Sequence, residues 1–142
     1  MSNGNVHDGT TIGLAIIASA VVWYYYGMVP GVIVGLSCLF GGLMLSPDLD
    51  IRSNPYNRWF ILKWIWWPYQ TMGHRNWLSH SLIIGTIGRV CYLLMWVELC
   101  LIWFVPWQVQ WQWVQLRWEW VIWGLVGIEG AAVLHLLLDW VG

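Results

Sequence analysis

The side chains best suited to metal chemistry are four histidines and four aspartates, which fall in four short blocks of the 142-residue chain. Imidazole and carboxylate groups ligate zinc, manganese and iron, and three scattered cysteines without CxxC spacing argue against a thiolate zinc site. These ligands outnumber what one tetrahedral ion needs, so we expect one or two divalent ions, with zinc as first choice and manganese or iron as alternatives. The candidate metal ligands are His7, Asp48, Asp50, His74, His80, His135 and Asp139.

One block lies inside an apolar segment and is therefore the most informative. His135 is flanked by Leu134 and Leu136, and Asp139 follows one helical turn later on the same face. An ionisable side chain at such depth in a membrane helix is costly and usually functional. Polar residues near a membrane surface need no function, and this competing explanation covers four of the others: His7, Asp8, Asp50 and His74.

The composition indicates that lipid is the solvent for the elements that carry these blocks. Hydrophobic residues make up 59% of the chain and charged residues 9%, whereas soluble domains carry about a quarter charged residues. The net charge of −1 gives no argument for a nucleic-acid partner. We predict an all-α fold, a four-transmembrane-helix bundle in a single domain over residues 1–142. The expected helices cover residues about 10–28, 31–45, 81–105 and 119–141.

Small residues at four-residue spacing predict close packing of these helices, as in Gly31 with Gly35, Ser81 with Gly85, and Gly127 with Ala131.

The connections suggest how the helices are oriented. Residues 49–78 form the longest polar loop, and the aromatic stretch 58–67 within it is expected to be an interfacial segment between the second and third helices. This loop holds four basic residues, so the positive-inside rule puts it on the cytoplasmic side with both termini and the metal site. The four basic residues are Arg52, Arg58, Lys63 and Arg75. The sequence leaves open whether the membrane is a plasma membrane or a thylakoid.

The chain carries four ordered motifs, which are Pro47-Asp48-Leu49-Asp50, His74-Arg75, Ser79-His80-Ser81, and His135 with Asp139. Together they resemble the YdjM-like inner-membrane metal-dependent hydrolases. They are similar, more closely still, to a family of small cyanobacterial membrane proteins described as metal-binding. In the YdjM-like pattern a glycine follows the arginine and a threonine precedes the later histidine, whereas this chain has Asn76 and Ser79 at those positions. The resemblance therefore implies metal binding more firmly than it implies a reaction.

Two functions fit this pattern best. The first is a metal-dependent hydrolase acting on an amphiphilic or phosphate-bearing substrate near the cytoplasmic interface. In it, Asp8 is either a catalytic base or an N-cap of the first helix, and Arg75 either binds the anionic substrate or anchors the loop. The alternative is a non-catalytic accessory or assembly subunit of a larger membrane complex, for example a photosynthetic one, with a structural metal. A haem or chlorophyll protein with histidine axial ligands is disfavoured, because such ligation needs no carboxylates.

Two further charges lie inside the expected helices. Arg89 and Glu129 sit at similar depth by helical rise, so a buried pair is conceivable. Helical phase puts Arg89 about half a turn from the face of His80, which places it outside the expected site.

Overall fold

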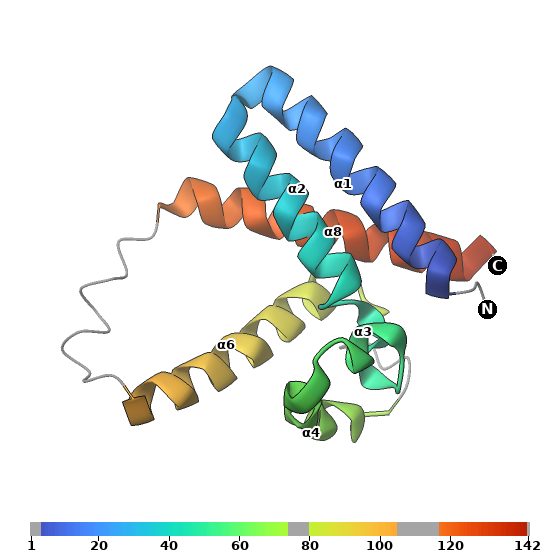
Figure 1. The fold of residues 1–142 in the computed structure, drawn as a ribbon, viewed down its shortest axis with the longest axis vertical. Helices are drawn as coiled ribbons and strands as arrows, with labels where there is room; N and C mark the ends of the chain where they lie inside the picture. Colours follow the sequence, from blue (N-terminus) through green and yellow to red (C-terminus); the bar gives the residue numbers. More distant parts are fainter. Residues whose placement is uncertain (1–3, 74–79, 105–116, 142) are drawn as a thin grey trace.

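The computed structural model describes residues 4–73, 80–104 and 117–141, and these residues contain only helices and turns (Figure 1). The predicted all-α fold with four long apolar helices is confirmed. Short helices η1, α3, η2 and α4 fill the connection between the second and third long helices. In chain order the elements are α1 (Gly4–Tyr26), α2 (Met28–Leu43), η1 (Pro47–Asp50), α3 (Asn54–Asn57), η2 (Phe60–Trp66), α4 (Trp67–Gln70), α6 (Ile84–Phe104) and α8 (Trp118–Val141).

All four long helices are long and apolar enough to cross a membrane, with the second span counted as Met28–Asp50. Large apolar side chains cover the outside of these helices, as shown by Ile16 at 66% and Trp103 at 84% relative exposure. In water such a surface would be an aggregation hazard, whereas in lipid it is the expected solvent-facing surface. The four helices therefore indicate an integral membrane protein.

Small residues bring α1, α2 and α8 into close contact. A Cβ atom added at Gly127 of α8 would lie 2.6 Å from the backbone oxygen of Val34 in α2, and one at Gly35 would lie 2.9 Å from the Cβ of Ser19 in α1. Ala131 is almost fully buried in the same core. Two of the three predicted small-residue pairs therefore do pack. In the third pair, Ser81 precedes α6, which begins at Ile84, whereas Gly85 lies in its first turn and is buried.

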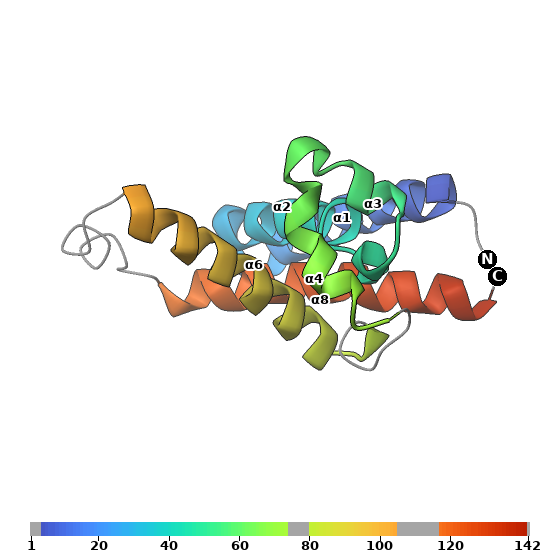
Figure 2. The ribbon, with the colours of Figure 1, turned by 90° about the horizontal axis from the view of Figure 1, so that it is seen from below.

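The remaining long helix, α6, diverges from α8 (Figures 1 and 2) and packs against the connection between α2 and α6. The Tyr92 hydroxyl of α6 donates a hydrogen bond to the Ile65 carbonyl of η2. Trp96 of α6 packs edge-on against Trp64, with ring centroids 5.2 Å apart. The stretch predicted to be interfacial thus forms η2 and α4 and packs along α6, around a core that includes the fully buried Trp66.

The same connection is fastened to the ends of α1 and α2 by Arg58. Its Nη1 donates to the Leu43 carbonyl at 2.9 Å and to Asp8 Oδ1 at 3.1 Å, and the Trp59 indole donates to the Met44 carbonyl at 2.9 Å. These donors satisfy carbonyls at the C-terminal end of α2 that have no intrahelical partner. The N-cap interpretation of Asp8 is wrong, because α1 begins at Gly4 and Asp8 therefore lies within the helix. Its carboxylate pairs with Arg58 of the connection.

Candidate metal centre

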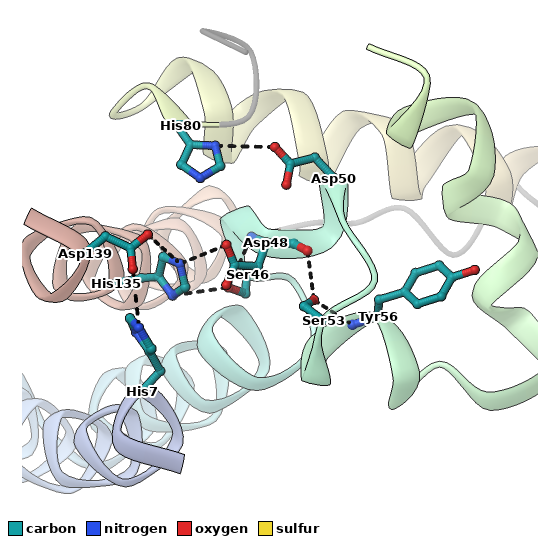
Figure 3. A network of polar contacts seen from close by, with 9 residues as sticks. All are labelled: His7, Ser46, Asp48, Asp50, Ser53, Tyr56, His80, His135 and Asp139. Carbon is teal, nitrogen blue, oxygen red and sulfur yellow. Dashed lines mark hydrogen bonds and ion pairs between the residues drawn. The ribbon is translucent and has the colours of Figure 1, made fainter. Parts of the chain in front are cut away.

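Four chain segments converge on one cluster of imidazoles and carboxylates at the ends of the packed helices (Figure 3). The cluster exists because α1 begins, and α2 and α8 end, on the same side of the molecule (Figure 1). Beyond α2, Ser46 caps η1 and Pro47 occupies its first turn, so the chain turns sharply and carries Asp48 into the cluster. The five contributing side chains are His7 from α1, Asp48 from η1, His80 from the segment before α6, and His135 and Asp139 from α8.

The first group of potential ligands comprises His7, His135 and Asp139, whose ligand atoms lie within 4.8 Å of one another. The two oxygens of Asp139 face different histidines: Oδ1 is 3.4 Å from His7 Nε2, and Oδ2 is 3.5 Å from His135 Nε2. The two imidazole rings lie with centroids 4.3 Å apart and are tilted by 33°. This arrangement gathers two nitrogen ligands and a carboxylate around a single position.

The second group comprises Asp48, His80 and Asp139, again with ligand atoms within 4.8 Å of one another. Asp48 Oδ1 also lies 3.3 Å from His135 Nε2, which links the second group to the first. Asp139 belongs to both groups. The two groups are therefore adjacent parts of one centre rather than separate clusters.

The chemistry of His135 fits a metal ligand. Its Nε2 is buried and makes no hydrogen bond within the described part of the chain, although the Asp48 and Asp139 carboxylates lie within 3.5 Å. Its Nδ1 lies 3.4 Å from Ser46 Oγ, which also accepts a hydrogen bond from the Asp48 amide. In the tautomer with the proton on Nδ1, facing the Ser46 hydroxyl, the Nε2 lone pair faces the space between the two carboxylates, as in many metal-ligating histidines.

Asp50 lies beside this centre but belongs to neither group. Its carboxylate is buried, and Oδ2 is 3.5 Å from His80 Nδ1, while the other ring nitrogen of His80 faces the side of Asp48 and Asp139 (Figure 3). Of the two roles expected for Asp50, ligand of a second ion or partner that orients a histidine, this geometry favours the second.

Three other predicted site residues have different outcomes. Asp8 is paired with Arg58 and is in neither ligand group. His74 and Arg75 lie outside the described residues, so their roles as metal ligand and anion-binding residue remain predictions.

Ser46, which the sequence analysis missed, lies at the site, and Arg89, which it placed outside, lies nearby. Ser46 is fully buried against His135, and nothing in its local sequence marks it out beyond its place before Pro47. Arg89 is only 1% exposed, donates to Thr86 Oγ1 at 3.2 Å, and interacts electrostatically with Glu129 and Asp50. A turn separates His80 from α6, and within it Ile83 has a φ of 61°, so His80 and Arg89 do not lie on one continuous helix. The exclusion of Arg89 from the site stays a prediction.

The phenol of Tyr69 is buried and interacts electrostatically with Arg89. Burial raises the pKa of Tyr69 above its ordinary value, and the interaction with Arg89 only partly opposes that rise. Tyr69 is therefore a neutral hydrogen-bonding group at physiological pH.

Comparison with known proteins agrees with metal binding. An Aquifex aeolicus (strain VF5) protein named "Uncharacterized protein" is 37% identical over 60 residues, which cover 42% of this chain and 43% of the relative. No solved structure matches the chain significantly. The sequence pattern of one family matches residues 2–142, almost the whole length. The chain therefore belongs to the family described as "Uncharacterized metal-binding protein (DUF2227)".

Proposed function

We propose that this protein is a membrane-embedded metal-dependent hydrolase that acts on an amphiphilic, phosphate-bearing substrate. The observation that carries the proposal is that, among the residues that the structure describes, each ligand group supplies three protein ligands around a shared Asp139. Structural zinc sites are usually closed by four protein ligands, whereas catalytic sites have three and leave a position for water or substrate. Asp48 and Asp139 also keep 24% and 22% of their side-chain surface exposed, so reactants have access.

The sharing of Asp139 favours two ions over one. One ion would be held by His7, His135 and Asp139, and the other by Asp48, His80 and Asp139. Zinc is the first choice, and manganese or iron are alternatives with the same nitrogen and oxygen ligands. Two-ion sites are common in enzymes that cleave phosphate esters.

The roles of the side chains follow from their positions. Divalent ions supply Lewis acidity and lower the pKa of coordinated water toward about 7. Ser46 and Asp50 would orient His135 and His80, while Arg75 is proposed to bind the anionic group of the substrate. Asp8 remains a proposed base only if its pairing with Arg58 opens, because that pairing occupies both carboxylate oxygens.

Lipid-like substrates suit the location of the centre at the ends of membrane-spanning helices. The four basic residues of the long loop favour the cytoplasmic side for this end and for both termini. The resemblance to the YdjM-like hydrolases supports hydrolysis as the reaction class. Location in a cyanobacterial plasma or thylakoid membrane remains a proposal.

One observation favours the non-catalytic alternative, an accessory subunit with a structural metal. The end of α6 leaves Trp103 and Phe104 at 84% and 85% exposure, a surface that would suit a partner helix as well as lipid.

The test combines metal analysis with an activity assay on protein purified in detergent. Wild type, His135→Ala, Asp48→Ala and the control Glu98→Gln, which alters an exposed carboxylate of α6, are compared for bound metal and for phosphate release from phosphatidic acid vesicles. Metal-dependent release by wild type and Glu98→Gln, lost in the other two, supports the hydrolase. Stoichiometric metal without release supports the accessory subunit, and equal metal in all four proteins contradicts the proposed centre.

A further inference from the structure

Asp50 is a buried carboxylate that reaches the candidate metal centre through His80. Its side chain is 1% exposed and its Oδ2 lies 3.5 Å from His80 Nδ1, while the opposite edge of that ring faces Asp48 and Asp139 (Figure 3). A carboxylate behind a ligating histidine fixes the ring and makes it a better ligand. Burying such a charge is costly unless other groups hold and balance it, so the groups that hold Asp50 also determine how His80 is presented.

Gln70, the last residue of α4, holds the backbone on both sides of Asp50. Its Nε2 donates to the Leu49 carbonyl at 3.3 Å and to the Ile51 carbonyl at 3.2 Å. The Ile51 amide closes the same turn by donating to the Asp48 carbonyl at 3.2 Å. The backbone on either side of Asp50 is therefore fixed both within η1 and from α4, and the direction of the Asp50 side chain follows from it.

The side chain before Asp50 anchors the same turn from the inside. Leu49 is fully buried and packs in the aromatic core with Trp66 and Tyr69, in the connection that also carries Gln70. Successive side chains of a 3-10 helix point about 120° apart. With Leu49 directed into this core, Asp50 is directed to a different side of η1.

Arg89 of α6 supplies a counter-charge for Asp50. Its side chain is almost fully buried and interacts electrostatically with Asp50, and also with Tyr69 and Glu129. Arg89 Nη2 donates to Thr86 Oγ1 at 3.2 Å, which helps to fix the guanidinium. Asp50 therefore has a positive charge from α6 as well as a backbone held by α4.

We propose that Gln70 and Arg89 are positioning residues that hold Asp50 against His80 Nδ1 and thereby present the opposite nitrogen of His80 to the metal. Neither residue belongs to a ligand group. The connection between α2 and α6 thus builds one half of the metal centre besides packing along α6. The effect on metal affinity rests on the proposed metal-binding function, whereas the hold on Asp50 and His80 does not.

The first measurement follows the Nδ1–H proton of His80 by NMR. Full-length protein with 15N-labelled histidine is studied in detergent, both stripped of metal and loaded with zinc, and the signal is assigned by its loss in His80→Ala. Gln70→Met keeps the side-chain length but removes the donor, so Asp50 is no longer held and the proton should exchange with solvent about tenfold faster. The matched control is Thr71→Val, which removes the bond from the adjacent hydroxyl to the Pro68 carbonyl and should leave the exchange unchanged.

Two substitutions of Arg89 test the counter-charge. Arg89→Met removes the charge, so the His80 proton should again exchange about tenfold faster. Arg89→Lys retains the charge without the planar fork and should restore most of the protection. Rescue by lysine separates the effect of the charge from that of guanidinium packing.

The second measurement asks whether the effect on metal binding runs through His80. Zinc affinity is determined by chelator competition for Gln70→Met in two backgrounds: His7→Ala, which retains the group of Asp48, His80 and Asp139, and His80→Ala, which retains the other group. Gln70→Met should lower the affinity about tenfold in the His7→Ala background and less than about twofold in the His80→Ala background.

Wild-type exchange of the His80 proton in either Gln70→Met or Arg89→Met would contradict the joint role and overturn the proposal. Equal losses of zinc affinity in the two backgrounds would also overturn it, because they would indicate a general effect on the fold. If protection is lost as predicted but wild type does not hydrolyse phosphatidic acid, the positioning role stands and the hydrolase does not. If wild type hydrolyses phosphatidic acid but protection is unchanged in the variants, the reverse holds.

Discussion

Replacing Ser46 with alanine isolates the role of one buried hydroxyl in preparing the metal centre. Ser46 is fully buried, lies 3.4 Å from His135 Nδ1 and accepts the Asp48 amide at 3.4 Å. Alanine removes the group that directs the His135 ring and also removes the N-cap of η1. It leaves every proposed ligand in place.

The magnitude follows from these distances. Loss of a group that orients a ligating histidine weakens metal binding by about 10- to 100-fold. Both contacts are long for hydrogen bonds, so the lower end applies: about tenfold, or 1.4 kcal/mol. Loss of the cap adds about 1 kcal/mol of lost stability, independent of the metal.

Chelator-competition titration of zinc in detergent measures the affinity, and thermal unfolding of the apoprotein measures the stability. Ser53→Ala is the matched control, because Ser53 caps α3 and bonds the Asp48 carbonyl at 2.8 Å without reaching an imidazole. It should cost similar stability but less than about threefold in affinity. Wild-type affinity in Ser46→Ala, or an equal loss in Ser53→Ala, would refute the reasoning.

Further predictions concern the scaffold and the metal. Arg58→Met should leave the Asp8 carboxylate without its partner and lower apoprotein stability by about 1–3 kcal/mol in thermal unfolding. An unchanged melting temperature would mean that the ion pair contributes no stability. Gly127→Ala should cost about 1–3 kcal/mol because its Cβ would meet the Val34 carbonyl at 2.6 Å, while Gly124→Ala, with nothing within 4 Å, should be nearly neutral; equal effects would contradict the helix packing. Chelation should lower the melting temperature of wild type, because an ion bound only by the folded state stabilises it; no shift at saturating metal would argue against a centre linked to folding.

The parts of the site that the sequence predicts are those marked by depth or by spacing. His135 is an ionisable residue in a leucine-rich helix, and Asp139 follows it by one turn, so both could be assigned from helical geometry alone. Alternating helix directions then predict that His7, Asp48 and His80 meet them at one end.

Other contacts depend on backbone geometry that the sequence does not specify. The sequence suggested Asp8 as a cap because the apolar run begins after it. The helix instead extends back to Gly4 through polar residues, and the Thr10 hydroxyl donates a hydrogen bond to the Val6 carbonyl at 2.8 Å. The helical phase used for Arg89 assumes one continuous helix from His80, and the turn at Ile83 breaks that helix, so the relation of Arg89 to the site stays a prediction. The packing of α6 against η2 likewise consists of contacts between segments far apart in sequence.

The central claim is that two ligand groups share Asp139 in a single centre, and metal stoichiometry tests it most directly. Elemental analysis of metal-saturated protein is made on wild type, His7→Ala, His80→Ala and Asp139→Ala. The account predicts two ions in wild type, one in each histidine variant because each histidine serves one group, and neither at full occupancy in Asp139→Ala. One ion in wild type that both histidine substitutions abolish, or two ions retained in Asp139→Ala, would contradict it.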